Sequence, residues 1–424
     1  MIPRPGLAGI EGVSRRREAQ VVDVGPDERK CSRIAEGCHV RSTFLPFSPP
    51  LIGNEEIDEV VATLRSDWIT TGPKVRAFER EFADYVGSPA ALAVSSATDA
   101  MLVALAVMGL GPGDEVITST NTFCSTVHVI EHLGARPVLV DVEPDTLNLD
   151  PSAVERAVTT RTRAIMPVHV YGHPCDMDAI GAIASRHGLK ILEDAAHALP
   201  ASWRGRRIGG IGDLTAFSFY ATKNLTTGEG GMLTGDPELI RRARPWSLHG
   251  MSRDAYQRDS TEGSWFYEVT LPGFKCNMTD IQASIGIHQL RRLDESQSRR
   301  REIVRRYEEA LGACDAVALP VERPDVVHAW HLFVVRLRLD RLRIGRGRFI
   351  EELKRRNIGA SVHFIPIHLH PYYRDKYGLA PYDFPVAMDA YERIISLPLN
   401  LRLSDADVED VAGALQDVAR EFRR

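Results

Sequence analysis

Short apolar segments alternate with helical segments between residues 91 and 234, and this alternation limits the possible folds more than any other feature of the chain. Runs such as Ala91–Val94, Glu115–Thr118 and Leu189–Glu193 are too short for apolar helices and carry the branched residues that favour strands. Strands of this kind need cover on both faces, which crossover helices provide in a parallel sheet. The sequence therefore predicts an α/β fold with a large, mostly parallel sheet.

The pattern changes after a long helical stretch over Thr279–Leu311, which has a predicted break near Leu293. Trp330–Leu339 alternates like a half-buried strand, Gly359–His363 is predicted to be another strand, and Ser404–Phe422 is predicted to be a capped terminal helix. We predict a large domain over residues 44–290 and a smaller C-terminal α+β domain over residues 291–424. Residues 1–43 are arginine-rich without a sustained period, and we expect a poorly packed extension there.

Charge and composition exclude several functional classes. The 424 residues include 52 Lys and Arg against 57 Asp and Glu, which gives a net charge of −5 and no basic footprint for a nucleic acid. No apolar run approaches the roughly 20 residues that a membrane-spanning helix needs. The six cysteines are dispersed without a CxxC pair, so neither a zinc set nor any other metal site is expected. The first residues lack the apolar core of a signal peptide, and we expect a cytoplasmic protein.

Chemistry-bearing residues follow the predicted strands at the points where those strands end. Such positions converge in parallel sheets, because ligands bind beyond the carboxyl ends of the strands. Ser95–Thr98 opens a helix, where free N–H groups can hold a phosphate or carboxylate or serve only as an ordinary helix start. Asp194 ends a buried run and could cap a helix or pair with a protonated ring nitrogen. Ser218 and Lys223 lie in a loop rich in Thr and Gly, and Phe123 follows another strand.

Together these residues suit pyridoxal 5′-phosphate (PLP). This cofactor needs an amine for its aldehyde, an acid for its ring nitrogen, an aromatic face for its ring and a polar cradle for its phosphate. Asp194 as a carboxylate would keep the ring nitrogen protonated, and Lys223 as a free amine would act as the base that moves the substrate proton.

Several longer motifs strengthen this interpretation. They are ILEDAAHA, FSFYATKNLTTGEGGML, LPGFKCNMTDIQASIGIHQL, AWHLFVVRL and VHFIPIHLHPYY, together with the earlier DWITTGPKVRAFEREFADYVG, AVSSATDAMLVAL and VLVDVEPDTLNLD. In this combination the chain resembles the DegT/DnrJ/EryC1/StrS family of sugar aminotransferases from about Leu45 to the C-terminus.

The resemblance implies fold type I of the PLP enzymes, which is the fold of aspartate aminotransferase. It implies a homodimer with active sites at the subunit interface, and PLP as cofactor with pyridoxamine 5′-phosphate (PMP) as the intermediate form. It also implies amino transfer from glutamate or glutamine to a nucleoside-diphosphate keto-deoxysugar. The aminated sugar would serve glycosylation of an antibiotic, of another natural product or of a polysaccharide.

The resemblance also assigns roles residue by residue. Lys223 would bind the aldehyde and Asp194 the ring nitrogen, while His197 would approach the ring oxygen and Phe123 would stack on the ring. Ala97, Thr98 and Ser218 would hold the phosphate. Lys275 of the partner subunit would lie near the same phosphate, where many family members have asparagine. Trp68, Thr70, Thr71 and His363 would line the sugar pocket.

Two alternatives for the function remain open from the sequence: amination of a keto-polyol without a nucleotide, and PLP binding by a regulator without turnover. The presence of Lys223 favours transamination over both dehydration and a regulatory role. His363, His368 and His370 form a histidine cluster, and His368 and His370 are expected on one face of a strand. No carboxylate or cysteine accompanies them, so a substrate-lining or structural role is expected rather than a metal site.

Overall fold

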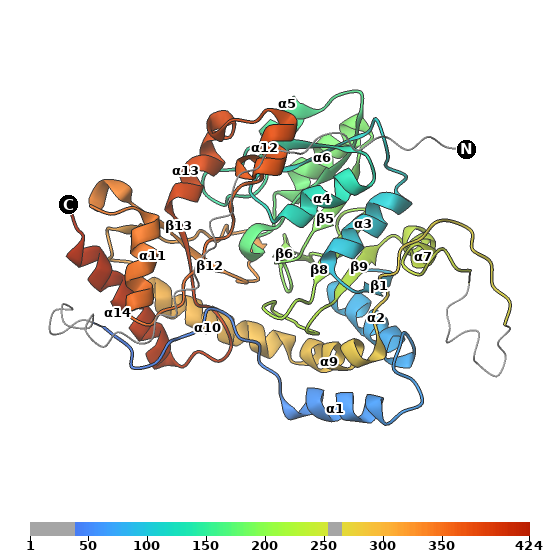
Figure 1. The fold of residues 1–424 in the computed structure, drawn as a ribbon, viewed down its shortest axis with the longest axis horizontal. Helices are drawn as coiled ribbons and strands as arrows, with labels where there is room; N and C mark the ends of the chain where they lie inside the picture. Colours follow the sequence, from blue (N-terminus) through green and yellow to red (C-terminus); the bar gives the residue numbers. More distant parts are fainter. Residues whose placement is uncertain (1–38, 253–264) are drawn as a thin grey trace, which may run out of the picture. The chain divides into compact units, whose positions relative to one another are not determined.

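A seven-stranded sheet with strand order β1-β9-β8-β5-β4-β2-β3 forms the centre of the larger part of the chain. The computed structural model describes residues 39–252 and 265–424 (Figure 1). The strands β1, β2, β3, β4, β5, β8 and β9 comprise Ala91–Val94, Glu115–Ser119, Arg136–Val140, Thr162–Met166, Lys190–Asp194, Leu214–Ser218 and Gly231–Gly235. Strand β9 pairs antiparallel with both of its neighbours, and the other pairs are parallel. The predicted mostly parallel sheet is thus confirmed.

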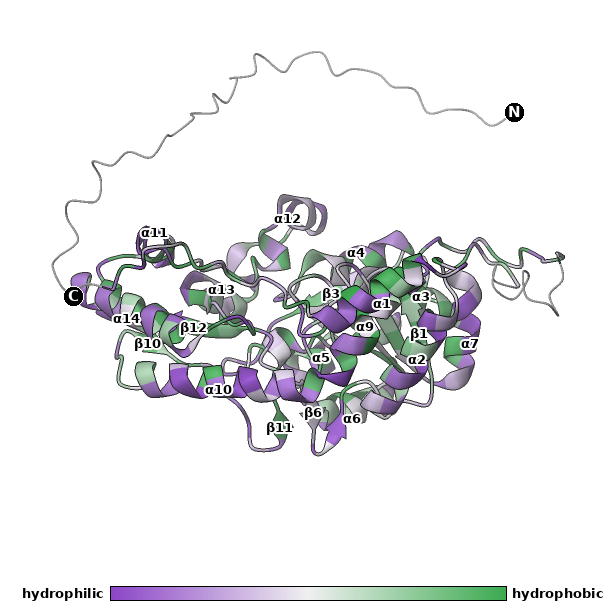
Figure 2. Ribbon diagram, turned by 90° about the horizontal axis from the view of Figure 1, so that it is seen from below, coloured by the Kyte–Doolittle hydropathy of each residue, from purple (hydrophilic) through white to green (hydrophobic). Residues whose placement is uncertain are grey.

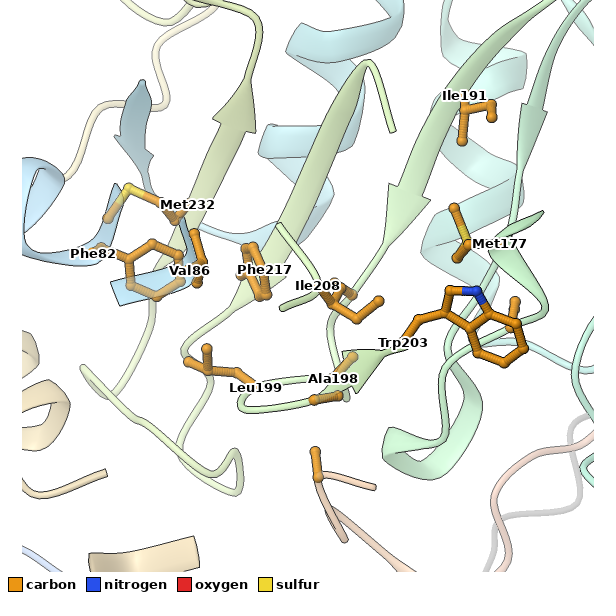
Figure 3. Close-up of a cluster of buried hydrophobic side chains, with 14 of the residues drawn as sticks. Phe82, Val86, Met177, Ile191, Ala198, Leu199, Trp203, Ile208, Phe217 and Met232 are labelled. Atoms are coloured by element: carbon orange, nitrogen blue, oxygen red, sulfur yellow. The ribbon is translucent and has the colours of Figure 1, made fainter. Parts of the chain in front are cut away.

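Helices cover both faces of this sheet, which explains why β1 and β2 are buried along their whole length. One face packs against α3, α4 and α7, and the other packs against α2, α5, α6 and α9. Phe82 of α2 contacts Phe217 of β8 with their ring centroids 5.0 Å apart, as part of the cluster drawn in Figure 3. The helices of these two layers are α2 (Pro73–Val86), α3 (Ala97–Val107), α4 (Cys124–His132), α5 (Pro151–Ala157), α6 (Met177–His187), α7 (Pro237–Trp246) and α9 (Asp280–Arg291).

The alternation of side chains along β5 decides where its two carboxylates lie. Ile191 packs with the α2 and α6 layer, whereas Leu192 packs with the α3 and α4 layer. Glu193 and Asp194 continue this alternation, because successive residues of a strand point to opposite faces. Asp194 therefore shares its face with α3 and α4.

A second core lies in the C-terminal part of the chain. The antiparallel sheet β10-β12-β13 packs there with α10, α11 and α14. Helix α10 carries hydrophilic residues along much of its length in Figure 2, and its buried residues include Ile303 and Tyr307. The helices and strands of this C-terminal part are β10 (Val317–Ala318), β12 (Phe333–Leu337), β13 (Ile394–Leu397), α10 (Leu293–Leu311), α11 (Arg346–Arg355), α12 (Pro371–Tyr377), α13 (Pro385–Arg393) and α14 (Asp405–Glu421).

Smaller elements complete the described part of the chain. Helix α1 comprises Asn54–Leu64 and packs against α9. The strands β6 (Ser202–Trp203), β7 (Arg206–Arg207) and β11 (Val326–Val327) form a third sheet. Short 3-10 helices comprise Val170–Gly172, Leu339–Arg341, Ile367–Leu369 and Pro381–Asp383.

The strand predicted at Gly359–His363 is not formed. Among the described residues, Ser361 forms an isolated bridge to Ser396 and Gly359 N donates to Leu45 O at 2.9 Å, but no continuous strand pairs with the segment. The shared strand face predicted for His368 and His370 is also wrong. His368 lies in the 3-10 helix Ile367–Leu369, and His370 precedes Pro371 at the start of α12. Proline at the first helical position favours a helix start at that point.

Residues 1–38 lie outside the described residues, and with them most of the predicted extension and the cysteines Cys31 and Cys38. Residues 39–43 were assigned to that extension, but they are held by the C-terminal core. His39 N–H donates to Asp417 Oδ2 at 2.7 Å, and Arg41 pairs with Asp407 at 2.6 Å and with Asp410 at 2.5 Å. The predicted boundary between domains near residue 290 stays a prediction. In the described ranges, no helix is both long enough and apolar enough to cross a lipid bilayer.

Candidate active site

A cavity of about 590 Å³ lies at the carboxyl ends of the parallel strands, where the sequence analysis placed the ligand. Because β9 runs antiparallel, its first residue, Gly231, lies at this same edge, and the preceding Gly230 lines the cavity. Eight of the predicted site residues line it: Ala97, Thr98, Phe123, Asp194, His197, Ser218, Lys223 and His363.

The remaining four predicted residues, Trp68, Thr70, Thr71 and Lys275, lie outside this cavity. Three of them belong to a second group of contacting residues. Trp68 Nε1 donates to the carbonyl oxygen of Thr71 at 2.9 Å, and Asn277 Nδ2 donates to Thr71 Oγ1 at 2.6 Å. Lys275 Nζ in turn donates to Asn277 Oδ1. Thr70 accepts a hydrogen bond from Asp280 N at 3.0 Å through its backbone oxygen.

The start of α3 provides an anion cradle. Ser96 is the N-cap, and its side chain accepts from Asp99 N at 3.0 Å. The backbone N–H groups of Ala97 and Thr98 have no hydrogen-bond acceptor among the residues that the structure describes. At a helix N-terminus such groups favour a phosphate. A Cβ at Gly231 would lie 2.5 Å from Ser96 O and 2.7 Å from Ala97 N, so the absence of a side chain there lets the strand approach this helix start.

Lys223 follows β8 in a turn that its own backbone closes by donating to Tyr220 O at 2.9 Å. Burial lowers the pKa of its ammonium from the usual 10.5 to about 8, and the nearby Asp194 opposes this shift. No acceptor for Nζ occurs among the described residues. The amine is therefore available to a ligand in the cavity.

Asp194 is almost fully buried at the end of β5. Its Oδ2 accepts from Thr126 Oγ1 at 2.8 Å, and its Oδ1 accepts from Ala196 N at 3.1 Å. Thr122 Oγ1 lies 2.7 Å from Thr126 Oγ1 and must donate to it, since the Thr126 proton is used for Asp194. Burial raises the pKa of Asp194 above its usual value, and these two donors oppose the rise. A cation in the cavity would favour the carboxylate further.

Aromatic and histidine rings form the rest of the wall. Phe123, the N-cap residue of α4, lies 5.9 Å from the ring of Phe364, and Phe364 stacks on His197 at 5.6 Å. His363 stacks on Phe47 at 5.4 Å. Burial lowers the pKa of His363 to about 4 and that of His197 well below its usual value. Both rings are thus neutral at neutral pH.

Several residues of this site were not predicted from the sequence, among them two that contact polar groups of the site, Thr126 and His331. Thr126 follows Phe123 by three residues, which brings it to the same end of α4, and this spacing was an available signal. His331 lies in the motif AWHLFVVRL and was interpreted as part of a strand, whereas β12 begins only at Phe333 and His331 lines the cavity. A polar ring at the start of an apolar run was the signal in that case.

The groups that line this cavity fit PLP. A buried amine without an acceptor, a buried carboxylate, an aromatic wall and a helix start with two free N–H groups meet in one cavity. Because Gly231 has no side chain, β9 can lie against this helix start without blocking its N–H groups. Among the described residues, no three His, Cys, Asp or Glu side chains are arranged to hold a metal ion.

Comparison with known proteins agrees with this chemistry. The chain is 54% identical over 382 residues to the spore coat polysaccharide biosynthesis protein SpsC of Bacillus subtilis, covering 90% of this chain and 98% of SpsC. Among solved structures, Spr1654 from Streptococcus pneumoniae, a sugar aminotransferase, matches in its PMP form with a TM-score of 0.84 and 37% identity, covering 89% of this chain and 99% of Spr1654. It also matches in its PLP form with a TM-score of 0.84.

A more distant relative has the same architecture. PseC of Helicobacter pylori, an aminotransferase involved in the biosynthesis of pseudoaminic acid, superimposes with a TM-score of 0.83 at 26% identity, covering 90% of this chain and all of PseC. The model of the DegT/DnrJ/EryC1/StrS aminotransferase family matches residues 50–416. The predicted fold type I and the predicted cofactor are confirmed by these relatives. The chain therefore belongs to the DegT/DnrJ/EryC1/StrS aminotransferase family and is a PLP-dependent sugar aminotransferase.

Proposed function

We propose that this enzyme transfers an amino group from glutamate or glutamine to the keto group of a nucleoside-diphosphate deoxysugar. The observation that supports this most directly is the position of Lys223 and Asp194 on the wall of one cavity that also includes the start of α3. When bound, PLP supplies an aldehyde whose carbon takes up the amino group and passes it on, and a ring that stabilises negative charge at the reacting carbon.

The residues of the cavity have separate roles in this proposal. The N–H groups of Ala97 and Thr98 and the hydroxyl of Ser218 bind the phosphate, and Phe123 contacts the face of the ring. Asp194, held by Thr126, keeps the ring nitrogen protonated. His197 donates a hydrogen bond to the ring oxygen.

Lys223 would hold the aldehyde of PLP, and its amine would move a proton at the reacting carbon of the substrate. A base is most effective when its pKa lies near the working pH, and the pKa of about 8 meets that condition. Borohydride reduction of the purified holoenzyme, followed by peptide mapping, should place the pyridoxyl label on Lys223. A label on another lysine would contradict this assignment.

We also propose that two copies of the chain share their active sites. Lys275, Asn277, Thr71 and Trp68 form a chain of hydrogen bonds outside the cavity of their own chain. This arrangement supports a role in the partner's site, where Lys275 of the partner subunit would add a positive charge near the phosphate. Trp68, Thr70, Thr71 and His363 would line the sugar pocket in such a dimer.

The reaction can be tested with glutamate and a panel of keto-sugars. We expect 2-oxoglutarate to form beyond one equivalent per active site only when a nucleotide-linked keto-deoxysugar is present. Turnover only with an unlinked ring ketone would favour the alternative of a keto-polyol substrate. The 54% identity to SpsC favours a product used for a polysaccharide over one used for an antibiotic.

A further inference from the structure

His331 lies in the wall of the active-site cavity and has no assigned role. The residue is 5% exposed and lines the cavity. Its backbone N–H donates to Tyr171 O at 3.0 Å, which holds it next to the segment around Tyr171. The ring is 4.4 Å from that of His197, measured between the ring centroids.

The hydrogen bonds around His331 determine which ring nitrogen carries its proton. Asn224 Nδ2 donates to the backbone oxygen of Ala329 at 2.8 Å, so the amide oxygen is the atom that faces His331 Nδ1 at 3.2 Å. An amide oxygen can only accept, and Nδ1 must therefore carry the hydrogen. Burial lowers the pKa of His331 well below its usual value, so the ring is neutral and Nε2 keeps a free lone pair.

The neighbouring His197 is in the opposite tautomer. The backbone N–H of Tyr171 donates to His197 Nδ1 at 3.2 Å, which leaves the ring hydrogen on Nε2. Two neutral imidazoles therefore lie side by side in the cavity, and one presents a donor while the other presents an acceptor. The Tyr171 N–H fixes the tautomer of His197 and the Asn224 amide fixes that of His331, so the two rings differ in tautomer while both are neutral.

His331 Nε2 has no donor within the described ranges of the chain. A buried acceptor without a donor costs free energy, so a polar atom of this kind in a cavity wall favours a ligand that brings an O–H or N–H group. The phosphate and the ring oxygen of PLP are both acceptors and cannot satisfy it. A sugar, in contrast, carries hydroxyl groups beside its keto carbon.

We propose that His331 is a specificity-determining residue, whose Nε2 accepts a hydrogen bond from the sugar hydroxyl next to the keto group. This inference rests on the proposed function. His331 Nδ1 lies 3.2 Å from the side chain of Asn224, the residue that directly follows Lys223, and His331 and Lys223 line the same cavity. The hydroxyl that reaches His331 is therefore one near the reacting carbon, and an acceptor there selects sugars that have that hydroxyl.

The test combines enzyme variants with substrate analogues. A nucleoside-diphosphate 4-keto-6-deoxyhexose is compared with its analogue that lacks the 3-hydroxyl, and kcat/KM is measured for both; for a 3-keto sugar, the 2- and 4-deoxy analogues serve. The wild-type enzyme should prefer the hydroxylated sugar by about ten- to a hundred-fold. His331→Phe keeps a ring but removes the acceptor, and its preference should fall to near unity. His331→Gln keeps an acceptor and should retain part of the preference.

Two further variants separate recognition from folding. Asn224→Leu leaves His331 in place but removes the acceptor that fixes its tautomer, so the preference for the hydroxyl should weaken there too. His328→Phe is the control, because His328 is equally buried and stacks on Trp330 but does not line this cavity. Its preference should equal that of the wild type. The absorbance change on adding glutamate alone reports the other half of the reaction and should be unchanged in His328→Phe.

Each outcome decides the proposal. An unchanged preference in His331→Phe, or in Asn224→Leu where His331→Phe does not fold, would overturn the role of His331 and leave the proposed function intact. A wild-type enzyme that reacts with glutamate but aminates no nucleotide-linked keto-sugar would overturn the proposed function, and this inference with it.

Discussion

At the scale of single residues, the contact between Thr126 and Asp194 determines how the carboxylate is held. Thr126 Oγ1 is the only side-chain donor to Asp194 among the described residues. Thr126→Val should raise the pKa of Asp194 further, because burial then acts with less opposition. We expect about 1.5–3 kcal/mol loss of stability from the missing hydrogen bond to a charged group, and weaker binding of PLP.

Equilibrium dialysis with PLP, together with denaturant unfolding, measures the two effects of Thr126→Val. Thr118→Val is the matched control, since Thr118 is equally buried but donates to Met166 O, outside the cavity. It should lose about 1 kcal/mol of stability with little change in PLP affinity. Equal losses of PLP affinity in both variants would show that Thr126 acts only through folding.

A second prediction at this scale concerns Lys223 and pH. The unfolded chain keeps the lysine proton up to its usual pKa of 10.5, whereas the folded chain releases it at about 8. Between these values the unfolded state binds more protons, so stability rises with pH. Below pH 8 the buried Lys223 is charged in both states, and its burial then lowers the free energy of unfolding of the cofactor-free protein to the greatest extent. Lys223→Met should thus be more stable than the wild type at pH 7, and the gap should shrink towards pH 10 in denaturant unfolding of both cofactor-free proteins. A gap that is constant with pH would contradict this.

The sequence predicted which residues line the cavity better than it predicted their hydrogen-bond partners. Lys223, Asp194 and Phe123 follow strand ends, so the topology of a parallel sheet brings them together. Thr126 and His331 act through hydrogen bonds and a tautomer, which depend on atoms from distant segments. Spacing could place Thr126 at the same end of its helix as Phe123, but it carries no information on which distant atoms Thr126 and His331 contact.

At the scale of elements, the approach of β9 to the start of α3 shapes the proposed phosphate cradle. Gly231→Ala would place a Cβ against Ser96 O and Ala97 N, backbone atoms that cannot move without displacing the helix start. We expect about 1–3 kcal/mol of destabilisation from this overpacking and a loss of PLP affinity. Fluorescence titration with PLP and thermal unfolding measure the two changes.

Gly181→Ala provides the control for Gly231→Ala. Gly181 lies within α6 and no atom would contact the added Cβ, so alanine should stabilise the protein by about 0.5–1 kcal/mol. PLP affinity should stay unchanged in this variant. Normal PLP binding by Gly231→Ala would show that the cradle tolerates a side chain.

The sequence predicted correctly the helix ends that are determined by residues close by in the chain. The break near Leu293 was correct, because α9 ends at Arg291 and α10 begins at Leu293. Ser404 caps α14 as expected, with its side chain accepting from Asp407 N. The missed strand β13 and the absent strand at Gly359–His363 depend instead on pairing with distant segments. Ile394–Leu397 has β12 as its partner along its whole length, whereas the other segment is bonded to the described residues only at isolated positions, Gly359 and Ser361.

At the scale of the whole molecule, the separation of Lys275 from the cavity of its own chain leads to a complementation experiment. Lys223→Ala should abolish turnover, and Lys275→Ala should lower it by weakening phosphate binding. In a mixed dimer with shared sites, both changes fall in one site and the other site is intact. Random mixing makes half of the dimers mixed, so co-expression of the two variants should restore about a quarter of the wild-type activity.

If each site were built from one chain, every site in the mixture would carry one of the two changes, and no activity would be gained over the mean of the separate variants. The gain therefore depends on which chain supplies Lys275. Mixing Lys223→Ala with the double variant Lys223→Ala/Lys275→Ala controls for the exchange of subunits, because no intact site can form from these chains. Gel filtration of each variant would show whether the changes affect association itself. Because an active site completed by a second chain exists only after association, a shared site would also make specific activity fall on dilution below the dissociation constant of the dimer.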